Sequence, residues 1–224
     1  VLSVFGNTVV LAVVSTLAAF LLGYPLALFI ATARPATAAI MIAVVMLPFW
    51  TSILIRSYAW MVLLGRQGIV NGALGWLGLI DEPMRLLNTS FAVYVGMTHI
   101  LLPFMILPVY GSLKAIDGRL VAAAENLGAG SLSVFRHIIF PLSMPGVLAG
   151  GVLVFVLALG FYITPALLGG PTDMTISMLI AQEVDLYRWD LASALATLLL
   201  LLTLAALVGV SRLISLERIL GGVR

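Results

Sequence analysis

The chain has 224 residues, of which 62% are hydrophobic and only 9% are charged, and its formal net charge is +2. A soluble domain carries charge on roughly a quarter of its residues, so this composition excludes a water-soluble globule and indicates an integral membrane protein. There is no cysteine, which excludes disulfides, thiolate metal sites and cysteine nucleophiles, and no basic run of the kind that binds nucleic acid.

Five apolar stretches, each about 20 to 27 residues long, are long enough to cross a bilayer as helices. Their apolar character is continuous rather than alternating, which favours helices over a β-barrel. The sequence therefore predicts an all-α membrane protein, a polytopic helical bundle that forms a single transmembrane domain over 1–224. The predicted spans cover roughly 5–31, 38–64, 88–113, 143–168 and 191–213.

Proline and the position of the first residue add two expectations. Proline inside a span invites a kink, which suits a cavity that changes shape, although proline is also common in membrane helices in general. The chain begins at Val1 within an apolar stretch, without an initiator methionine, so we expect the native protein to carry one more N-terminal helix. The prolines within the predicted spans are Pro25, Pro48, Pro103, Pro108 and Pro165.

A polar connection, 117–140, separates the third and fourth spans. Asp117 is a good helix N-cap, the sequence from Gly118 to Leu127 is helical in pattern, and Gly128 suits the left-handed residue that ends a helix. Ser131 can cap a second short helix, and Pro141 is expected to begin the next span. These features predict a helix–turn–helix outside the bilayer, which either docks on a partner or rests on the lipid headgroups.

The distribution of charge predicts the orientation. If 117–140 faces the cytoplasm, seven basic residues lie inside and four outside, whereas six of the nine acids lie outside, as the positive-inside rule requires. The C-terminus is then cytoplasmic. The inner basic residues are Arg34, Lys114, Arg119, Arg136, Arg212, Arg218 and Arg224, and the outer ones are Arg56, Arg66, Arg85 and Arg188.

Polar and aromatic residues within the spans are candidates for a solute path, because polar groups are costly in a bilayer. Each has a simpler alternative: Arg56 reaching the outer headgroups, His99 packing with a hydrogen bond, and Phe161 and Tyr162 forming an interfacial belt. The acids expected on the outer side have two interpretations: they attract a cation or a docking protein, or they are only solvated. They are Asp173, Glu183, Asp185 and Asp190. The candidate path residues are Trp50, Thr51, Arg56, Tyr58, His99, Phe161, Tyr162 and Thr164.

Chemistry for catalysis is missing from the sequence. The single lysine, Lys114, is not part of a Gly-x-x-x-x-Gly-Lys-Ser/Thr loop, and no His/Asp/Glu group has metal-ligand spacing. The chain is therefore not expected to be an enzyme or to bind a cofactor. If ATP and magnesium drive transport, they must bind another subunit.

The 117–140 loop resembles the EAA loop of permease subunits of binding-protein-dependent ABC importers. That motif is Glu-Ala-Ala, three residues, Gly, nine residues, Ile, one residue and Leu-Pro. The matches here are Ala123, Ala124, Gly128, Ile138 and Pro141, whereas Ala122 replaces the Glu and Phe140 the Leu; Glu125 is the nearest acid. Segments along nearly the whole chain, such as Leu47–Ser52 and Thr164–Pro171, are similar to the spermidine/putrescine branch of that family.

The resemblance implies a function and a set of partners. The chain would be a permease subunit in a bacterial-type inner membrane, moving a small, polyamine-like solute from an extracytoplasmic binding protein by alternating access. A cytoplasmic ATPase dimer would dock on the 117–140 loop, and a second permease, often a related but different chain, would complete the path. The alternatives are a secondary transporter or channel subunit without an ATPase, for which such a loop is not needed, and a membrane scaffold without a solute path.

Overall fold

The computed structural model describes residues 2–221, with side chains described for residues 2–209. All elements of regular structure in the described chain are helices, in agreement with the predicted fold class. Its elements are α1 (Leu2–Thr32), α2 (Pro35–Met46), η1 (Leu47–Trp50), α3 (Ile53–Leu64), α4 (Ile69–Trp76), α5 (Ser90–Lys114), α6 (Gly118–Asn126), α7 (Ser131–Val134), η2 (Phe135–Ile139), α8 (Phe140–Gly160), α9 (Ile163–Leu168), α10 (Ile176–Asp185) and α11 (Trp189–Gly221).

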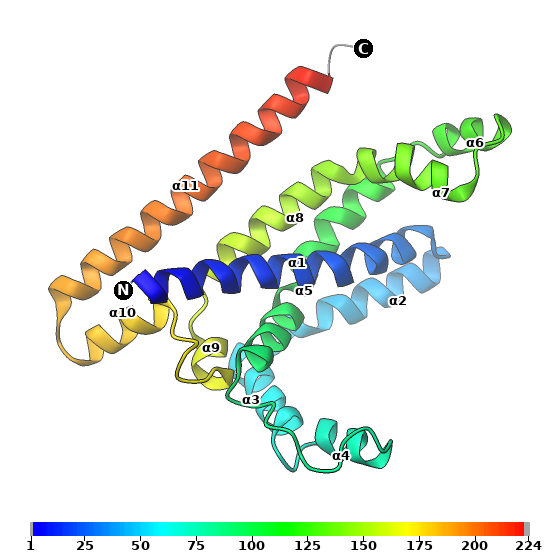
Figure 1. Ribbon diagram of the computed structural model, residues 1–224. Helices are drawn as coiled ribbons and strands as arrows, with labels where there is room; N and C mark the ends of the chain where they lie inside the picture. Colours follow the sequence, from blue (N-terminus) through cyan, green and yellow to red (C-terminus); the bar gives the residue numbers. More distant parts are fainter. Residues whose placement is uncertain (1, 222–224) are drawn as a thin grey trace.

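Helices α1, α5 and α8 form the core of the bundle, with α5 in the middle (Figure 1). The close approach of α5 and α8 depends on small residues, because without a strong hydrophobic force between membrane helices association rests on tight packing. A Cβ atom added at Gly146 would lie only 2.5 Å from the carbonyl oxygen of Pro108, and one at Gly150 would lie 3.0 Å from the sulfur of Met105. Glycine at these positions therefore allows the two backbones to touch.

The second predicted span, 38–64, is not one continuous helix. The α2–η1 and α3–α4 pairs are bent by 99° at a short break, so the described chain has four helices long enough to span a bilayer, or five if the bent pair counts as one. Pro48 lacks the N–H that a continuing helix needs. Thr51 donates from both its amide and its hydroxyl to the Pro48 carbonyl, and Ser52 caps α3 by accepting from Leu54 N at 3.3 Å. Local polar groups thus stabilise the break.

The fourth predicted span, 143–168, has different limits. One continuous helix runs from Ser131 to Gly160, and Ile163–Leu168 form the separate helix α9. Pro141 was expected to begin this span but lies inside the helix. The wider π-turn of η2 immediately precedes it, with Phe140 N donating to Phe135 O, and such a turn makes room for a proline ring without ending a helix.

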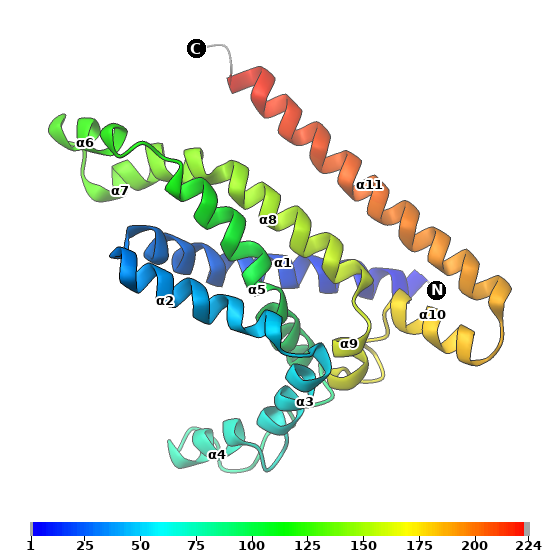
Figure 2. The same ribbon diagram turned by 180° about the vertical axis from the view of Figure 1, so that it is seen from behind.

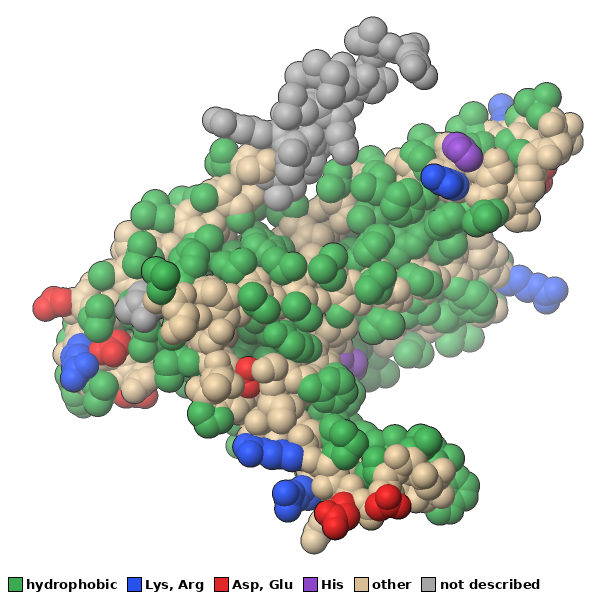
Figure 3. All heavy atoms as spheres, in the orientation of Figure 1, with side chains coloured by type: hydrophobic (Ala, Val, Ile, Leu, Met, Phe, Trp, Pro, Cys, Tyr) green, Lys and Arg blue, Asp and Glu red, His purple; other side chains and the backbone are tan. Residues whose placement is uncertain are grey.

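The polar ends of the molecule differ in charge. Figures 1 and 2 place the α1–α2 turn, the end of α5 and helices α6 and α7 at one end, and α4, α9 and α10 away from it. Basic side chains lie at both ends, whereas the acidic ones lie mainly near α4 and the α10–α11 turn, so the described charges leave the first end net basic (Figure 3). Arg224 lies outside the described residues, and Arg212 and Arg218 lie outside the part whose side chains are described.

Candidate functional site

A cavity of about 450 Å³ lies where three distant parts of the chain meet. The start of α3 contributes Thr51, Ser52 and Arg56, the middle of α5 contributes an apolar wall, and the end of α8 contributes Phe161. Three of the predicted path residues, Thr51, Arg56 and Phe161, are therefore brought together in one place. The apolar lining is made by Phe49, Ile53, Ile100, Phe104 and Leu157.

Two helix breaks border this cavity. The break at Thr51–Ser52 separates η1 from α3, and the break at Phe161–Tyr162 separates α8 from α9. Non-helical backbone at membrane depth is tolerated only where it is buried in protein or lines a water-filled cavity. Membrane transporters place solute sites at such discontinuous helices, whose exposed N–H and C=O groups act as ligands. The cavity thus combines an apolar wall with free helix ends and one guanidinium group.

Arg56 is the charged group of the cavity. Its side chain is half-buried, and its Nε atom is buried without a hydrogen-bond partner among the described residues. Among the described side chains, Arg56 forms no salt bridge with an acid. The salt bridge that is present there joins Arg188 to Glu183. A charge within a membrane-spanning segment is costly unless paired or solvated, which makes Arg56 a candidate functional residue of the cavity.

The remaining path candidates lie elsewhere. Thr164 is fully buried, and its hydroxyl lies 3.1 Å from that of Ser57, so it ties α9 to α3 rather than facing the cavity. Trp50, Tyr58 and Tyr162 are exposed and do not line the cavity.

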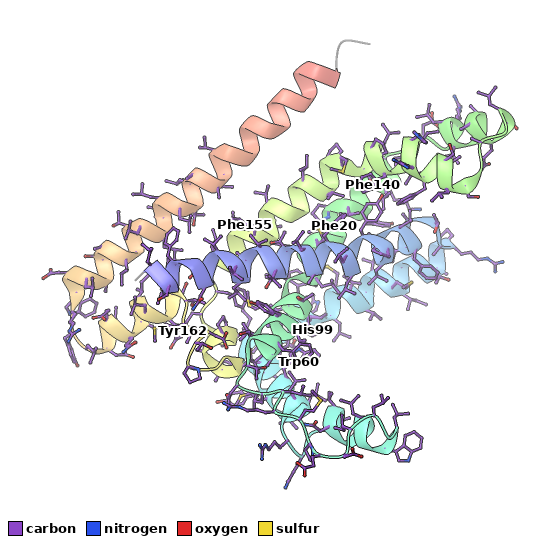
Figure 4. The ribbon with its side chains drawn as sticks, viewed as in Figure 1. Phe20, Trp60, His99, Phe140, Phe155 and Tyr162 are labelled. Atoms are coloured by element: carbon purple, nitrogen blue, oxygen red, sulfur yellow. The ribbon has the colours of Figure 1, made fainter. Side chains whose placement is uncertain are left out.

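His99 has a partner that the sequence did not single out. Trp60 Nε1 donates to His99 Nδ1 at 3.3 Å, and the two rings meet edge to face with centroids 5.7 Å apart. Figure 4 shows both residues beside each other at the crossing of α3 and α5. Trp60 is one helical turn after Arg56, so the two residues lie on the same face of α3. This spacing is the signal in the sequence that could have marked Trp60 as a candidate beside Arg56.

Two of the four outer acids have internal partners. Asp173 accepts from Ser90 Oγ and, at 2.7 Å, from Gly170 N, which holds the 170–175 loop against the start of α5. Glu183 is buried and lies 3.5 Å from Arg188. Asp185 and Asp190 are exposed. Among the described residues, no group of three His, Cys, Asp or Glu side chains could hold a metal ion.

A second cavity, of about 480 Å³, lies between α1, α5, α8 and α11. Phe20, Phe140 and Phe155 contribute to its almost entirely apolar lining, and Figure 4 shows them along α1 and α8. The hydroxyl of Thr16 donates to the carbonyl of Ala12 in its own helix. This cavity has no polar groups that would select a polar solute. The periodicity of a single helix could not predict the cavity, because four helices contribute to its lining.

The 117–140 loop projects from the basic end of the bundle as two short helices (Figures 1 and 2). The predicted cap is present, because Asp117 Oδ1 accepts from Arg119 N at 2.9 Å, and Gly128 has φ of +86°, in the left-handed region. Ser131 was expected to cap the second helix, but Gly130 occupies the N-cap position and Ser131 is the first helical residue. The turn has the expected length but lies one residue earlier, because α6 ends at Asn126.

Helix α6 buries none of its residues. Ala122, Ala123 and Glu125 are exposed, Ala124 is half-buried, and Leu127 is 89% exposed. Further along, Ile138 is half-buried and Pro141 is exposed. The loop thus presents a small-residue surface with an apolar tip, and it is held to the molecule mainly through α7.

Comparison with known proteins identifies the family. A family described as binding-protein-dependent transport system inner membrane component matches residues 6–220. The spermidine/putrescine transport system permease protein PotB of Escherichia coli (strain K12) is 40% identical over 185 residues, which are 82% of this chain and 67% of PotB. The permease protein PotC of the same system and organism is 37% identical over 120 residues, 54% of this chain and 45% of PotC.

The fold is also that of a solved permease. A chain of a bacterial alginate ABC transporter, solved in complex with an alginate pentasaccharide-bound periplasmic protein, superposes with a TM-score of 0.80 at 22% identity, covering 93% of this chain and 76% of that one. Its sequence identity supports a shared fold only. The match over 6–220 together with the identity to PotB decides the assignment. The chain therefore belongs to the binding-protein-dependent transport system inner membrane components, as a multi-pass permease subunit of an ABC importer.

Proposed function

We propose that this permease moves a polyamine-like solute into the cytoplasm, and that a binding protein on the outer side delivers the solute. The observation that carries this proposal is the similarity to PotB, whose name refers to spermidine and putrescine, over more than four fifths of the chain. The cavity beside the two helix breaks supports it as the place where solute passes, since it has an aromatic and apolar wall with polar groups at one side.

The second permease of the complex is proposed to be a related but different chain. PotB and PotC of one organism are both permease proteins of the same named system, and this chain is similar to both. Two related permeases enclosing one path would allow the two halves of the path to carry different side chains.

ATP and magnesium are proposed to bind a separate ATPase dimer that docks on α6 and the following turn. The exposed alanines let a partner approach closely, and Glu125 is the acid that remains for a charged contact. Because α7, η2 and α8 form one continuous helix, a push on the loop would be transmitted directly to the end of α8 at the cavity. The basic end of the bundle would then face the cytoplasm.

The test is the uncoupling of transport by Gly128→Asp in the assembled importer. Gly128 has a positive φ, so a side chain there costs about 1–2 kcal/mol, and the new charge lies near Glu125. We expect ATP hydrolysis stimulated by binding protein loaded with spermidine or putrescine to be lost, while the amount of permease in the membrane is unchanged.

The matched control is Gly72→Asp, which adds the same charge to α4, far from the loop, where a Cβ meets nothing within 4 Å. Stimulated hydrolysis should persist in this variant. Normal stimulation in Gly128→Asp would refute docking at the loop, and polyamine uptake that continues without ATP would refute the importer mechanism in favour of a secondary transporter.

A further inference from the structure

Arg56 is a cation within the membrane-spanning part of the chain that has no counter-charge among the described side chains. Its Nε atom is buried without a hydrogen-bond partner among the described residues, and its guanidinium lines the cavity at the start of α3. The acids whose side chains are described all lie at helix ends or in connections: Asp81, Glu82, Asp117, Glu125, Asp173, Glu183, Asp185 and Asp190. None of these carboxylates pairs with Arg56, so its counter-charge is missing from the described part of this chain.

The surface around Arg56 exposes polar groups as well as apolar ones. Trp50 is 89% exposed and Tyr58 is 55% exposed, and neither the indole N–H nor the phenol hydroxyl has a hydrogen-bond partner within the described part of the chain. His99, which accepts from Trp60 of α3, is also exposed on α5. Lipid tails accept no hydrogen bonds, so polar groups in the membrane generally face protein or water.

Helix α11 provides the contrast within the same molecule. Its exposed side chains in the described part include Leu198, Leu200, Leu201 and Leu204. The exposed hydroxyls of Ser193 and Thr197 donate to backbone carbonyls of the same helix. Such a surface is satisfied by lipid alone. The η1–α3 face also exposes hydrocarbon, at Leu54, Ile55 and Val62. It differs from the 198–204 part of α11 in adding the indole of Trp50 and the phenol of Tyr58 on the elements that flank Arg56.

We propose that the second permease subunit of the importer covers the η1–α3 face, and that a carboxylate of that subunit pairs with Arg56. This inference rests on the proposed function for the existence of a second permease. Charge complementarity selects the occupant, because a planar guanidinium held at depth is best matched by a carboxylate that accepts two N–H bonds. The pair would close the open side of the cavity.

The pair would also remove an electrostatic conflict. An unpaired guanidinium on the path would repel a polyamine, whereas a neutralised one would not, so a cationic solute and Arg56 become compatible only when the second subunit is in place. Arg56 is thus a positioning residue at the interface and does not bind the solute.

Assembly provides the first test. The whole importer is expressed with a tag on this chain, and the second permease that co-purifies in mild detergent is quantified. We expect Arg56→Glu to reduce co-purification at least tenfold at an unchanged membrane level, and Arg56→Lys, which keeps the charge, to retain most of it. Replacing the matching acid of the second permease by Arg should restore assembly of Arg56→Glu.

Crosslinking provides the second test and has a matched control. Because the chain has no cysteine, Tyr58→Cys and Leu201→Cys each give one site for a photoreactive maleimide, at residues that are 55% and 57% exposed. We expect the label at position 58 to capture the second permease and the label at position 201 to capture none of it. No capture at position 58 would overturn the proposed interface.

The outcomes separate this inference from the proposed function. If Arg56→Glu co-purifies normally, or if Arg56→Gln assembles fully but changes only the solute concentration that half-saturates transport, Arg56 acts in the solute path and the inference is wrong while the importer assignment stands. If the unaltered chain purifies without any second permease, the proposed two-permease importer and this inference both fail.

Discussion

Asp117 is a residue whose role follows from its own backbone. Its carboxylate accepts from Arg119 N at 2.9 Å and so satisfies one of the free N–H groups at the start of α6. Helix α6 buries none of its residues, which means that little tertiary packing supplements this cap. The local energetics of the cap should therefore be visible in the stability of the helix.

Replacing Asp117 by Ala should destabilise α6 by about 1 kcal/mol, because the cap hydrogen bond is lost. Amide hydrogen exchange of Gly118–Asn126, measured by mass spectrometry in detergent, should become about fivefold faster for such a loss. Asp117→Asn is the control, since Asn caps as well as Asp, and it should exchange at the original rate. Equal acceleration in both variants would show that charge and not capping stabilises α6.

The packing of α5 against α8 is decided at the scale of the element. Gly146 lies against the backbone of α5, and a Cβ there would be 2.5 Å from both Pro108 O and Ser112 Oγ. Gly151, on the same helix, faces open space apart from a methyl group of Thr16 at 4.0 Å. Replacing glycine by alanine therefore tests the contact between α5 and α8 at Gly146. At Gly151 it tests only the change from glycine to alanine.

We expect Gly146→Ala to lower the stability of the permease by about 1–3 kcal/mol, since the carbonyl oxygen cannot move away without displacing α5. The measurement is the midpoint of thermal unfolding in detergent, followed by loss of monodisperse protein. Gly151→Ala should leave the midpoint within error. An unchanged midpoint in Gly146→Ala would mean that the two helices are not in close contact.

The proposed orientation of the molecule rests on how its charges are distributed between the two ends. Arg34, Lys114, Arg119 and Arg136 lie at the end that carries α6 and α7, whereas Asp81, Glu82 and Asp185 lie away from it. Basic residues flanking spans are retained on the cytoplasmic side during insertion. The two ends should thus be distinguishable by a reagent that cannot cross the membrane.

Single cysteines in this cysteine-free chain provide that measurement. Asp81→Cys and Asp185→Cys should react with an impermeant maleimide added to intact spheroplasts, because their positions are exposed on the proposed outer side. Arg34→Cys and Leu127→Cys should react only after the membrane is opened. The reverse pattern would invert the proposed orientation and separate the α6–α7 loop from any cytoplasmic ATPase.

Much of the architecture could be predicted from local sequence. The excess of apolar residues determined a membrane protein, since too little polar surface exists for water, and run length determined the approximate spans. Helix α6 was predicted almost to the residue because a cap at Asp117 and a left-handed Gly128 are local properties of the backbone. The spacing of small residues, Gly, Ile and Pro in the loop was likewise enough to indicate the family.

Only the tertiary structure decided where the long helices break and what the breaks enclose. Hydropathy averages side-chain polarity along the chain, so it predicted one span for α2 and α3 and another for α8 and α9. At the first break, Thr51 and Ser52 form the local hydrogen bonds, and two such residues hardly lower the mean hydropathy of the stretch. The cavity is formed by α3, α5 and the end of α8 together. Thr164 does not line it, because its hydroxyl is paired with that of Ser57 in the buried contact between α9 and α3. Composition determines that the chain enters the membrane, whereas contacts between residues far apart in sequence determine which polar groups face the path.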